Sequence, residues 1–322
     1  MDNILVTGGA GYIGSHIVER LVRLRKRVFI IDNLSTGHKK LINKKAKFFF
    51  CDIKNFKKLE EIIRDNKIQS VIHLAASLSV GESQKKPKKY YQNNVQGTVN
   101  TIKACRLNNI KNFIFSSTCA VYKDGISHVK ESSILKPTSV YGSTKSSCEK
   151  LITDKLKDKK INYAILRFFN VAGASNSGKI GLISKNDQLF KNLSIAVKKK
   201  KPKINIYGNN YDTEDGTCVR DYIHVSDISH IHILALKKIN KVKKSVILNC
   251  GYGKGISNLD AVKEFEKQIK KNIKIQYKDK RKGDMKKIVA DIKKIKKFLK
   301  WKPNQNSLAR IVKSCIKWEK KL

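Results

Sequence analysis

The sequence predicts an α/β fold, in which a doubly wound parallel sheet is followed by a smaller C-terminal lobe. Three observations lead to this prediction. Short apolar runs alternate with helical patterns through the first half of the 322-residue chain. A glycine-rich turn joins the first apolar run to the first helical pattern. After about residue 172 the alternation weakens into shorter, lysine-rich elements. Such alternation is typical of parallel sheets that carry helices on both faces.

The first strand and helix are joined by three glycines spaced three residues apart. Residues 4–6 are an apolar run, a helical pattern covers residues 17–24, and Gly8, Gly11 and Gly14 stand between them. A strand, a glycine turn and a helix in this order begin a Rossmann-type dinucleotide-binding unit. One glycine permits the sharp turn, one lets the backbone approach a pyrophosphate, and one lets the helix pack on the strand. The alternative is a tight turn without a ligand.

The second predicted strand ends in a carboxylate. Residues 27–31 form an apolar run that leads into Asp32 and Asn33, about 20 residues after the glycines. A carboxylate there can accept hydrogen bonds from both adenosine ribose hydroxyls, and it repels a 2′-phosphate. No arginine or lysine follows until Lys39. The pattern therefore favours NAD over NADP, although Asp32 could also be a plain residue at a strand end.

Four further apolar runs in the first half predict strands that end in polar or small residues. They cover residues 48–50, 71–74, 113–115 and 164–166. Helical patterns over residues 95–107 and 145–156 fill two of the gaps. Because ligands bind at the carboxyl ends of parallel strands, the residues that follow these runs are candidates for one shared crevice.

The weakening of the alternation sets the expected domain boundary. We expect a dinucleotide-binding domain over residues 1–171 and a smaller lobe that holds the substrate over residues 172–322, from which some C-terminal segments return to the first domain. Hydrophobic residues make up 40% of the chain, and no apolar run approaches the ~20 residues that span a bilayer.

Cysteine usage and the first residues of the chain indicate a cellular compartment. The seven cysteines are dispersed and include no CxxC pair, which suits reduced thiols better than a disulfide framework or a zinc site. The chain enters an apolar run at once, without the basic region and cleavage site of a signal peptide. We expect a cytoplasmic protein without a metal site.

The formal net charge of +43 raises the question of a polyanionic partner. Only ten of the 69 basic residues are arginine, and they are spread along the chain without interleaved aromatic and glycine motifs. Isoleucine and asparagine are also abundant, which indicates a genome rich in A and T. We expect no specific nucleic-acid partner and no membrane partner, although the positive field attracts an anionic substrate.

A tyrosine and a lysine four residues apart open the helical pattern near residue 145. Tyr141 and Lys145 share one helix face, and Thr118 ends the preceding apolar run. An ammonium group, together with the positive nicotinamide ring of NAD, should lower the pKa of the phenol and make Tyr141 a base. Lys145 can also hold the nicotinamide ribose, and Thr118 can relay a substrate proton. Alone, this spacing often occurs by chance; after the glycines and Asp32, we interpret it as catalytic.

Several longer motifs make the chain resemble the extended short-chain dehydrogenase/reductase family, and within it the UDP-glucose 4-epimerases. The resemblance covers almost the whole chain. The most specific motif is DTEDGTCVRDYIHV, at residues 212–225. The others cover residues 6–16, 32–37, 80–83, 90–95 and 113–118.

The resemblance implies a reaction cycle without net oxidation. Tyr141 removes the proton of the sugar 4-hydroxyl while C4 gives a hydride to tightly bound NAD. The 4-keto sugar rotates and takes the hydride back on its other face, which yields the C4 epimer. Binding must therefore hold the UDP firmly and the hexose loosely.

The resemblance also implies the positions that hold the cofactor. Asp52 and Ile53 hold the adenine, and Phe169 lies near the nicotinamide. The remaining cofactor positions are Gly8, Gly11, Tyr12, Ile13, Gly14, Asp32, Asn33, Leu34, Ser35, Thr36, Gly37, Leu74, Ala75, Ala76, Ser77, Asn93, Tyr141 and Lys145.

A second set of positions is implied for the UDP-sugar. Arginine suits diphosphate because its planar group offers paired donors. These positions are Thr118, Asn170, Gln188, Leu189, Asn205, Ile206, Tyr207, Arg220, Arg281, Asp284 and Ile288. Gln188 and Leu189 begin a segment where many relatives carry a Leu-Ile-Pro-like turn. Ile288 stands where family members vary between small and large residues that gate N-acetylated sugars.

Three alternatives remain. A sugar-nucleotide dehydratase would carry Asp-Glu after Thr118, where this chain has Cys119 and Ala120. An epimerase of another UDP-sugar, with an N-acetylhexosamine, uronate or pentose group, is a closer rival. A non-catalytic NAD-binding protein is disfavoured because both Tyr141 and Lys145 are present. The resemblance further implies a homodimer formed through the helices around Val95 and Lys145.

Overall fold

The computed structural model describes residues 2–157, 161–184, 187–281 and 283–322. Within these ranges the chain forms two compact units that are interleaved along the sequence. Unit 1 comprises Met1–Val121, Leu135–Arg167 and Ser229–Leu248, and unit 2 comprises Tyr122–Ile134, Phe168–Ile228 and Asn249–Leu322. The chain thus crosses between the units several times, and the later segment Ser229–Leu248 belongs to unit 1.

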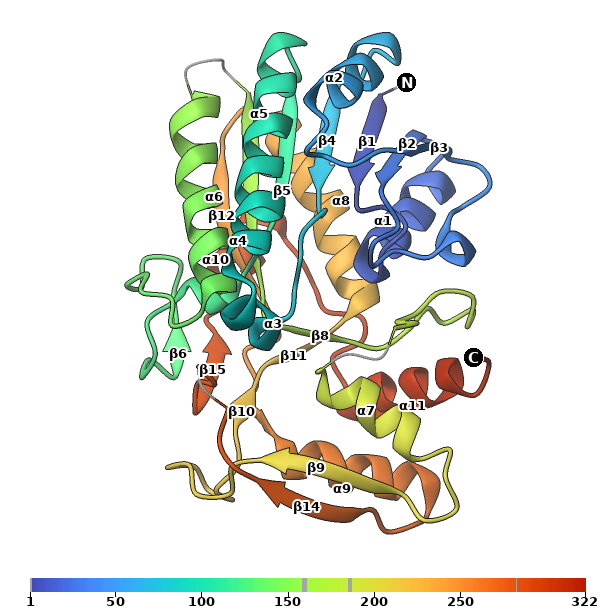
Figure 1. Cartoon of the computed structure of the whole chain (residues 1–322), viewed down its shortest axis with the longest axis vertical. Helices are drawn as coiled ribbons and strands as arrows, with labels where there is room; N and C mark the ends of the chain where they lie inside the picture. Colours follow the sequence, from blue (N-terminus) through green and yellow to red (C-terminus); the bar gives the residue numbers. More distant parts are fainter. Residues whose placement is uncertain (1, 158–160, 185–186, 282) are drawn as a thin grey trace. The chain divides into compact units, whose positions relative to one another are not determined.

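Unit 1 is built on a seven-stranded sheet with the order β12-β7-β5-β4-β1-β2-β3 (Figure 1). The neighbours of β1 and β4, and the pair β2–β3, run parallel. The strands are β1 (Asn3–Thr7), β2 (Arg27–Asp32), β3 (Lys47–Phe50), β4 (Ser70–His73), β5 (Asn112–Thr118), β7 (Asn162–Phe168) and β12 (Val246–Cys250). Strand order reverses between β1 and β4, which is the switch point where open α/β sheets bind ligands. This sheet confirms the predicted α/β fold.

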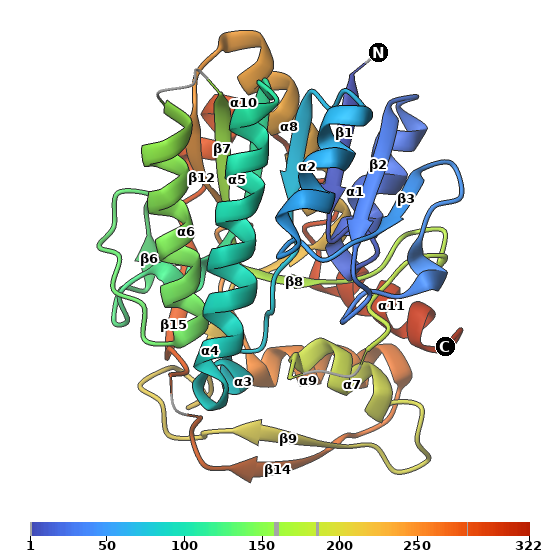
Figure 2. The ribbon, with the colours of Figure 1, turned by 45° about the horizontal axis from the view of Figure 1, so that its top comes forward.

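Helices cover both faces of this sheet. On one face, α2 packs on α5 and α5 packs on α6; Figures 1 and 2 show α5 and α6 in front of the strands. On the other face, Arg20 Nε of α1 donates to Ser229 Oγ of α8 over 3.2 Å. The helical segments are α1 (Tyr12–Arg23), η1 (Lys39–Leu41), α2 (Phe56–Asp65), α3 (Val80–Lys85), α4 (Pro87–Tyr90), the π-helical η2 (Tyr91–Gln96), α5 (Gly97–Leu107), η3 (Cys119–Val121), α6 (Val140–Lys157) and α8 (Val225–Val242).

Unit 2 consists of three small sheets and a group of helices. Its sheets have the orders β13-β10-β15-β6, β11-β8 and β14-β9. The strands are β6 (His128–Val129), β8 (Asn170–Ala172), β9 (Lys203–Tyr207), β10 (Val219–Arg220), β11 (Tyr222–His224), β13 (Ile256–Ser257), β14 (Lys274–Lys278) and β15 (Lys287–Ala290). The helices are α7 (Leu189–Ala196), α9 (Asn258–Ile269), α10 (Lys293–Leu299) and α11 (Leu308–Glu319). Because β6 pairs with β15, residues 122–134 belong to this unit despite their place in the first half of the chain.

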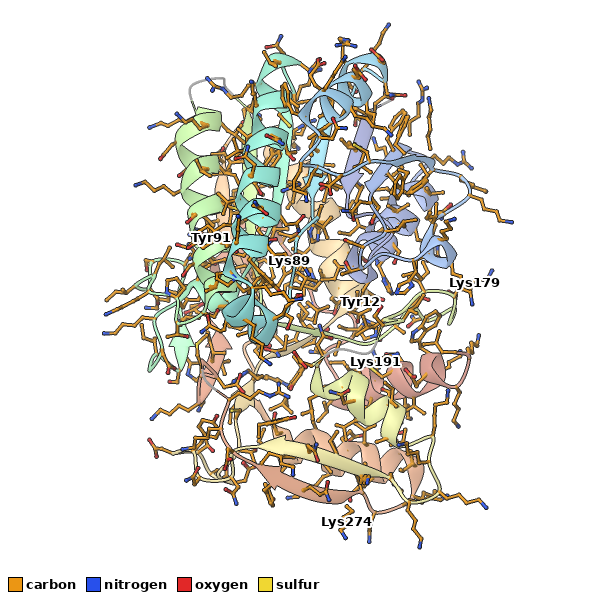
Figure 3. All side chains as sticks on the ribbon, in the orientation of Figure 1. Tyr12, Lys89, Tyr91, Lys179, Lys191 and Lys274 are labelled. Carbon is orange, nitrogen blue, oxygen red and sulfur yellow. The ribbon has the colours of Figure 1, made fainter. Side chains whose placement is uncertain are left out.

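The cysteine and lysine side chains differ in where they lie in the structure. All seven cysteines are buried free thiols. Lys89, Lys179 and Lys274 are exposed, whereas Lys191 is buried in an ion pair with Glu319 (Figure 3).

Among the described residues, no group of histidine, cysteine and carboxylate side chains could hold a metal ion. None of the helices in these ranges has the length and apolarity needed to cross a membrane.

A buried histidine links the strand before the glycine turn to helix α5. Thr7 Oγ1 lies 2.7 Å from His73 Nδ1, and His73 Nε2 lies 3.0 Å from Thr98 Oγ1. Since the Thr98 hydroxyl donates to the Asn94 carbonyl, it must accept from His73, so the ring carries its proton on Nε2. Burial lowers the pKa of His73 to about 3.

This depressed pKa predicts a loss of stability in mild acid. In the unfolded chain the pKa of His73 returns to about 6.5. Below that pH the unfolded chain therefore binds a proton at His73, whereas the folded chain does not. Between pH 6.5 and pH 5.0 the free energy of unfolding should fall by about 2 kcal/mol from His73 alone. Urea unfolding at both pH values measures the change, and a His73→Gln variant should show a smaller one. Equal slopes in the two proteins would contradict the assignment.

Candidate active site

Three residues predicted to be catalytic come together in unit 1. Tyr141 and Lys145 lie on the first two turns of α6, and Thr118 is the last residue of β5. The side chains of Tyr141 and Thr118 share a hydrogen bond. Lys145 Nζ donates to the carbonyl oxygen of Ser116 over 2.8 Å. The helix spacing and the strand end thus place a phenol, a hydroxyl and an ammonium group within one small region.

The electrostatics of this region differ from the expectation. Burial raises the pKa of Tyr141, and the hydrogen bond from Thr118 offsets only part of that shift. Lys145 is not among the groups that shift the pKa of Tyr141 in the chain alone, and its ammonium donates to the Ser116 carbonyl. Burial lowers the pKa of Lys145 to about 8. Lys145 is therefore mostly protonated at neutral pH, whereas Tyr141 needs further positive charge to act as a base.

The glycine turn has the geometry that a phosphate cradle requires. Gly8 has a φ of +72°, which favours glycine, and its N–H donates to the Ile31 carbonyl over 2.7 Å. A Cβ atom on Gly14 would lie 2.1 Å from the Gly8 oxygen, so α1 can approach β1 only without a side chain there. Gly11 is the N-cap of α1, and the half-exposed Tyr12 and Ile13 form its first turn. Gly8 thus permits the sharp turn, and Gly14 permits the close packing of α1 on β1. Gly11 is the remaining candidate for a close approach of the backbone to a ligand.

Asp32 is held at the end of β2 by backbone N–H groups. It is 7% exposed, and its two carboxylate oxygens accept from Ala10 N over 3.0 Å and from Leu34 N over 2.8 Å. A carboxylate oxygen has two lone pairs, so each oxygen keeps one for a ribose hydroxyl. A Cβ on Gly37 would lie 2.7 Å from Asp32 Oδ1, which shows how closely the loop wraps this group. Burial raises the pKa of Asp32, and the two N–H groups oppose that rise.

The loop after Asp32 is joined to the end of β3. Asn33 Nδ2 donates to Asp52 Oδ2 over 3.0 Å. Leu34 has a φ of +56°, a conformation that costs energy for a branched side chain and clusters at functional sites. Ser35 and Thr36 are exposed. The predicted adenine positions therefore lie beside the predicted ribose position.

The segment after β4 is bound to the π-helical turn. Leu74, Ala75, Ala76 and Ser77 are half-buried. Ser77 N donates to Asn94 Oδ1 over 2.7 Å, and Asn93 Nδ2 donates to Ser77 Oγ over 3.1 Å.

The sequence analysis missed Asn94, which is buried and also donates to Thr144 Oγ1 of α6 over 3.1 Å. A π-helical turn often marks a functional site, but no sequence pattern predicts where such a turn forms. The first residue of α5, Gly97, packs tightly against Ile53, because a Cβ on Gly97 would lie 2.3 Å from Ile53 Cδ1.

Unit 2 brings four of the predicted substrate residues together. The Arg281 guanidinium stacks on the Tyr207 ring at 3.7 Å from the ring centroid. Arg220 Nη2 lies 3.9 Å from Asp284 Oδ1, and the N–H of Asp284 donates to the Arg281 carbonyl over 3.2 Å. Ile288 pairs with Arg220 in the register of β10 and β15 and is 1% exposed. Two arginines, a carboxylate and an aromatic ring thus form one cluster.

The remaining predicted positions of unit 2 are spread over several elements. Gln188 is the N-cap of α7 and Leu189 its first residue. Asn205 is exposed and Ile206 buried, as alternation along β9 requires. Phe169 is buried, and its N–H donates to the Cys250 carbonyl, whereas Asn170 begins β8 and is half-buried.

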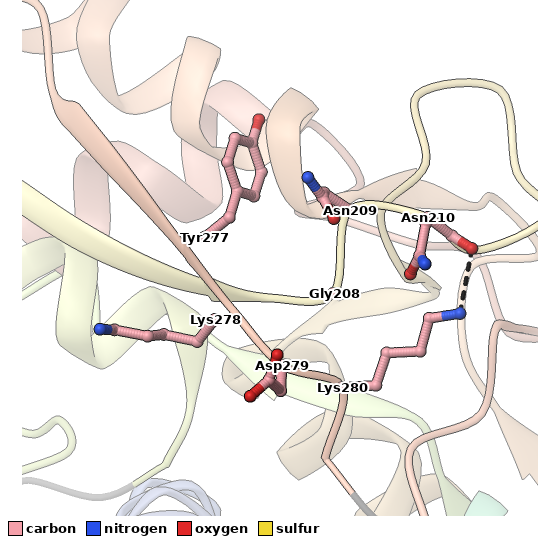
Figure 4. Close-up of a pocket in the computed structure, with 7 residues that line it drawn as sticks. All are labelled: Gly208, Asn209, Asn210, Tyr277, Lys278, Asp279 and Lys280. Atoms are coloured by element: carbon pink, nitrogen blue, oxygen red, sulfur yellow. Dashed lines mark hydrogen bonds between the residues drawn. The ribbon is translucent and has the colours of Figure 1, made fainter.

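Beside Tyr207, unit 2 has a hollow of about 370 Å³ (Figure 4). It is lined by Gly208, Asn209, Asn210, Tyr277, Lys278, Asp279 and Lys280. Lys280 Nζ donates to the Asn210 carbonyl over 3.0 Å and lies over the Tyr211 ring. None of the predicted site residues lines this hollow, although two of them, Tyr207 and Arg281, adjoin its lining residues in sequence.

Comparison with known proteins gives consistent matches over the whole chain. The model of the NAD dependent epimerase/dehydratase family matches residues 4–251. The chain is 41% identical to a UDP-glucose 4-epimerase of Lactobacillus helveticus, over 98% of this chain and 97% of that protein.

Solved structures agree with this match. A UDP-glucose-4-epimerase of Stenotrophomonas maltophila, with bound NAD and formylated UDP-arabinopyranose, superposes with a TM-score of 0.95 at 31% identity, over 100% of this chain and 98% of that chain. A UDP-Glc/GlcNAc 4-epimerase of Campylobacter jejuni superposes with a TM-score of 0.86 at 36% identity, over 100% of both chains. The likeness thus extends over both units of the chain.

Proposed function

Because the chain belongs to the NAD-dependent epimerase/dehydratase family and is an NAD-dependent UDP-sugar 4-epimerase, we propose that it interconverts UDP-glucose and UDP-galactose. Family membership confirms the resemblance found in the sequence. The hydrogen bond between Tyr141 and Thr118, one helical turn from Lys145, is the observation that carries the proposed mechanism. The choice of hexose is supported by the relative that is 41% identical over nearly the full length.

The residues of unit 1 fit NAD. The turn at Gly8, Gly11 and Gly14 leaves a helix N-terminus open for a diphosphate, and Asp32 keeps one lone pair on each oxygen for the ribose. Asn33 and Asp52 stand beside it for the adenosine. When bound, NAD supplies the hydride acceptor and donor for the sugar C4 and a positive ring beside the phenol.

In the proposed reaction, the protein moves one proton. Tyr141 Oη takes the proton of the 4-hydroxyl group and returns it after the sugar has turned, and Thr118 shares that proton across its hydrogen bond. Lys145 is held by the Ser116 carbonyl and retains donors for the nicotinamide ribose.

The UDP group is proposed to bind to the cluster of unit 2. Arg220 and Arg281 offer forked donors to the diphosphate, and Tyr207 offers a ring edge to the uridine. Asp284 holds Arg220 in place, so the charges of the site are partly balanced before the substrate arrives. The expected homodimer is part of this proposal, and sedimentation of the purified protein tests it.

Incubation of the purified protein with UDP-galactose, without added cofactor, should produce UDP-glucose. NMR of the anomeric protons follows the conversion, and the UV spectrum of the acid-released cofactor measures bound NAD. UDP-N-acetylgalactosamine, UDP-glucuronate and UDP-xylose serve as parallel substrates. Turnover of one of these, and none of UDP-galactose even with NAD supplied, would replace the proposed hexose by that sugar.

A further inference from the structure

A buried ion pair lies in unit 1 on the helix that carries Tyr141. Arg167 of β7 and Glu149 of α6 are 2% and 4% exposed. Arg167 Nη2 lies 2.6 Å from Glu149 Oε2, and Arg167 Nε lies 3.0 Å from Glu149 Oε1. Ser117 Oγ also donates to Glu149 Oε1, over 2.5 Å. Both oxygens of the carboxylate therefore accept hydrogen bonds, and its position is closely fixed.

This pair continues the stripe of α6 that faces β5. Residues four apart on a helix share one face, so Tyr141, Lys145 and Glu149 lie in a row. Lys145 donates to the carbonyl of Ser116, and Glu149 accepts from the hydroxyl of Ser117. Two successive turns of α6 are thus bonded to the two residues that precede Thr118. The distance between the phenol and Thr118 depends on these bonds.

Stability alone does not require such a pair. Moving both charges out of water costs several kcal/mol for each ion, and replacing a buried pair by apolar residues of similar size is often neutral or stabilising. Neither Glu149 nor Arg167 is one of the residues proposed to move the proton. Glu149 lies one helical turn after Lys145, which suggests that the pair acts on that lysine.

The groups around Lys145 show which of them can supply a negative charge beside its ammonium group. From α6, Tyr141, Cys148 and Glu149 are close to it. From the strands, His73 of β4 and the Phe115 ring and Ser116 carbonyl of β5 are close to it, and Arg167 of β7 is bonded to Glu149.

Among these groups, Glu149 is the carboxylate. Burial keeps the Cys148 thiol neutral by raising its pKa, and burial keeps the His73 ring neutral. Burial also lowers the pKa of Lys145, and Cys148 and then Glu149 oppose that shift.

We propose that Glu149 and Arg167 are positioning residues for the epimerase reaction: Glu149 bonds α6 to β5 one turn after Lys145 and supplies a counter-charge to that lysine, and Arg167 holds Glu149. This role rests on the proposed function, because it concerns the ammonium beside the proposed base. Loss of Glu149 should destabilise the ammonium, so Lys145 should lose its proton at a lower pH.

The test exchanges the whole pair, so that no charge is left unpaired. E149M/R167M puts unbranched apolar side chains in place of both charged ones, and K191M/E319M makes the same exchange in the buried pair Lys191–Glu319, 2.7 Å apart. We expect E149M/R167M to retain NAD and a KM within threefold, while the alkaline limb of its kcat profile moves down by about one pH unit, a tenfold loss above that limb. Glu149→Asp should restore the limb, and K191M/E319M should leave it unmoved. An unchanged profile in E149M/R167M would overturn the proposal.

A second measurement does not depend on turnover. In ¹⁵N-lysine spectra, buried ammonium groups exchange slowly with water and give separate signals; Lys145→Arg identifies the signal of Lys145. In E149M/R167M this signal should titrate at a lower pH than in the wild type, while that of Lys191 stays in place. If the wild type turned over no UDP-sugar, the proposed function would fail, but this titration would still decide the role of Glu149. Identical titration in both proteins would show that the pair is only structural.

Discussion

Replacing Tyr141 by phenylalanine should lower kcat by about 10²–10⁴-fold, the usual contribution of a general base. The substitution removes the one oxygen that shares a hydrogen bond with Thr118 and leaves the ring volume in place. The glycine turn and Asp32 are untouched, so NAD content should match that of the wild type. Initial rates with UDP-galactose and the absorbance of released NAD measure the two quantities.

Tyr163→Phe is the matched control for this substitution. Tyr163 stands near the start of β7, where its backbone N–H donates to Ser245 Oγ, and the residue lies outside the proposed site. Its loss should change kcat by less than twofold. A Tyr141→Phe enzyme that kept a tenth or more of the wild-type kcat would rule out Tyr141 as the base, because a second group would then have to take the proton.

Most of the sheet of unit 1 could be predicted because most of its strands are buried; β3 is half-buried or exposed but still reads as an apolar run. Buried parallel strands read as continuous apolar runs, and each of the six runs found in the sequence became a strand of the seven-stranded sheet. The place of residues 122–134 in unit 2 could not be predicted. It depends on pairings such as His128–Val129 with β15, and a two-residue strand has no recognisable pattern.

The candidate base and its neighbours could be predicted because helix spacing and strand ends are local features. The direction of the pKa shift of Tyr141 in the chain alone could not, because burial depends on packing that the sequence does not display. The sequence did contain an indication that Glu149 and Arg167 are partners. An arginine inside the run AILRF must have a partner if that strand is buried, and Glu149 stands one turn after Lys145 on the helix.

The glycines of the turn allow the fold to be separated from cofactor binding. Gly14→Ala would place a Cβ 2.1 Å from the Gly8 oxygen and 2.9 Å from the Gly9 Cα, and neither backbone atom can move without shifting β1 from α1. We expect unfolding to become easier by about 3 kcal/mol, at the upper end of overpacking effects, with loss of bound NAD. Thermal unfolding and NAD content are the measurements.

Gly11→Ala makes the same change where the fold leaves more room. Gly11 has a φ of −82°, which alanine adopts freely, and the new Cβ would lie 3.2 Å from the Gly8 oxygen. The melting temperature should therefore stay within a few degrees of the wild type. If a diphosphate lies against the N-terminus of α1, this Cβ takes up its space, and NAD affinity should fall by at least about tenfold, or 1.4 kcal/mol. A stable Gly11→Ala protein with wild-type affinity would place the diphosphate elsewhere. A Gly14→Ala protein with wild-type stability would mean that α1 does not need its close approach to β1.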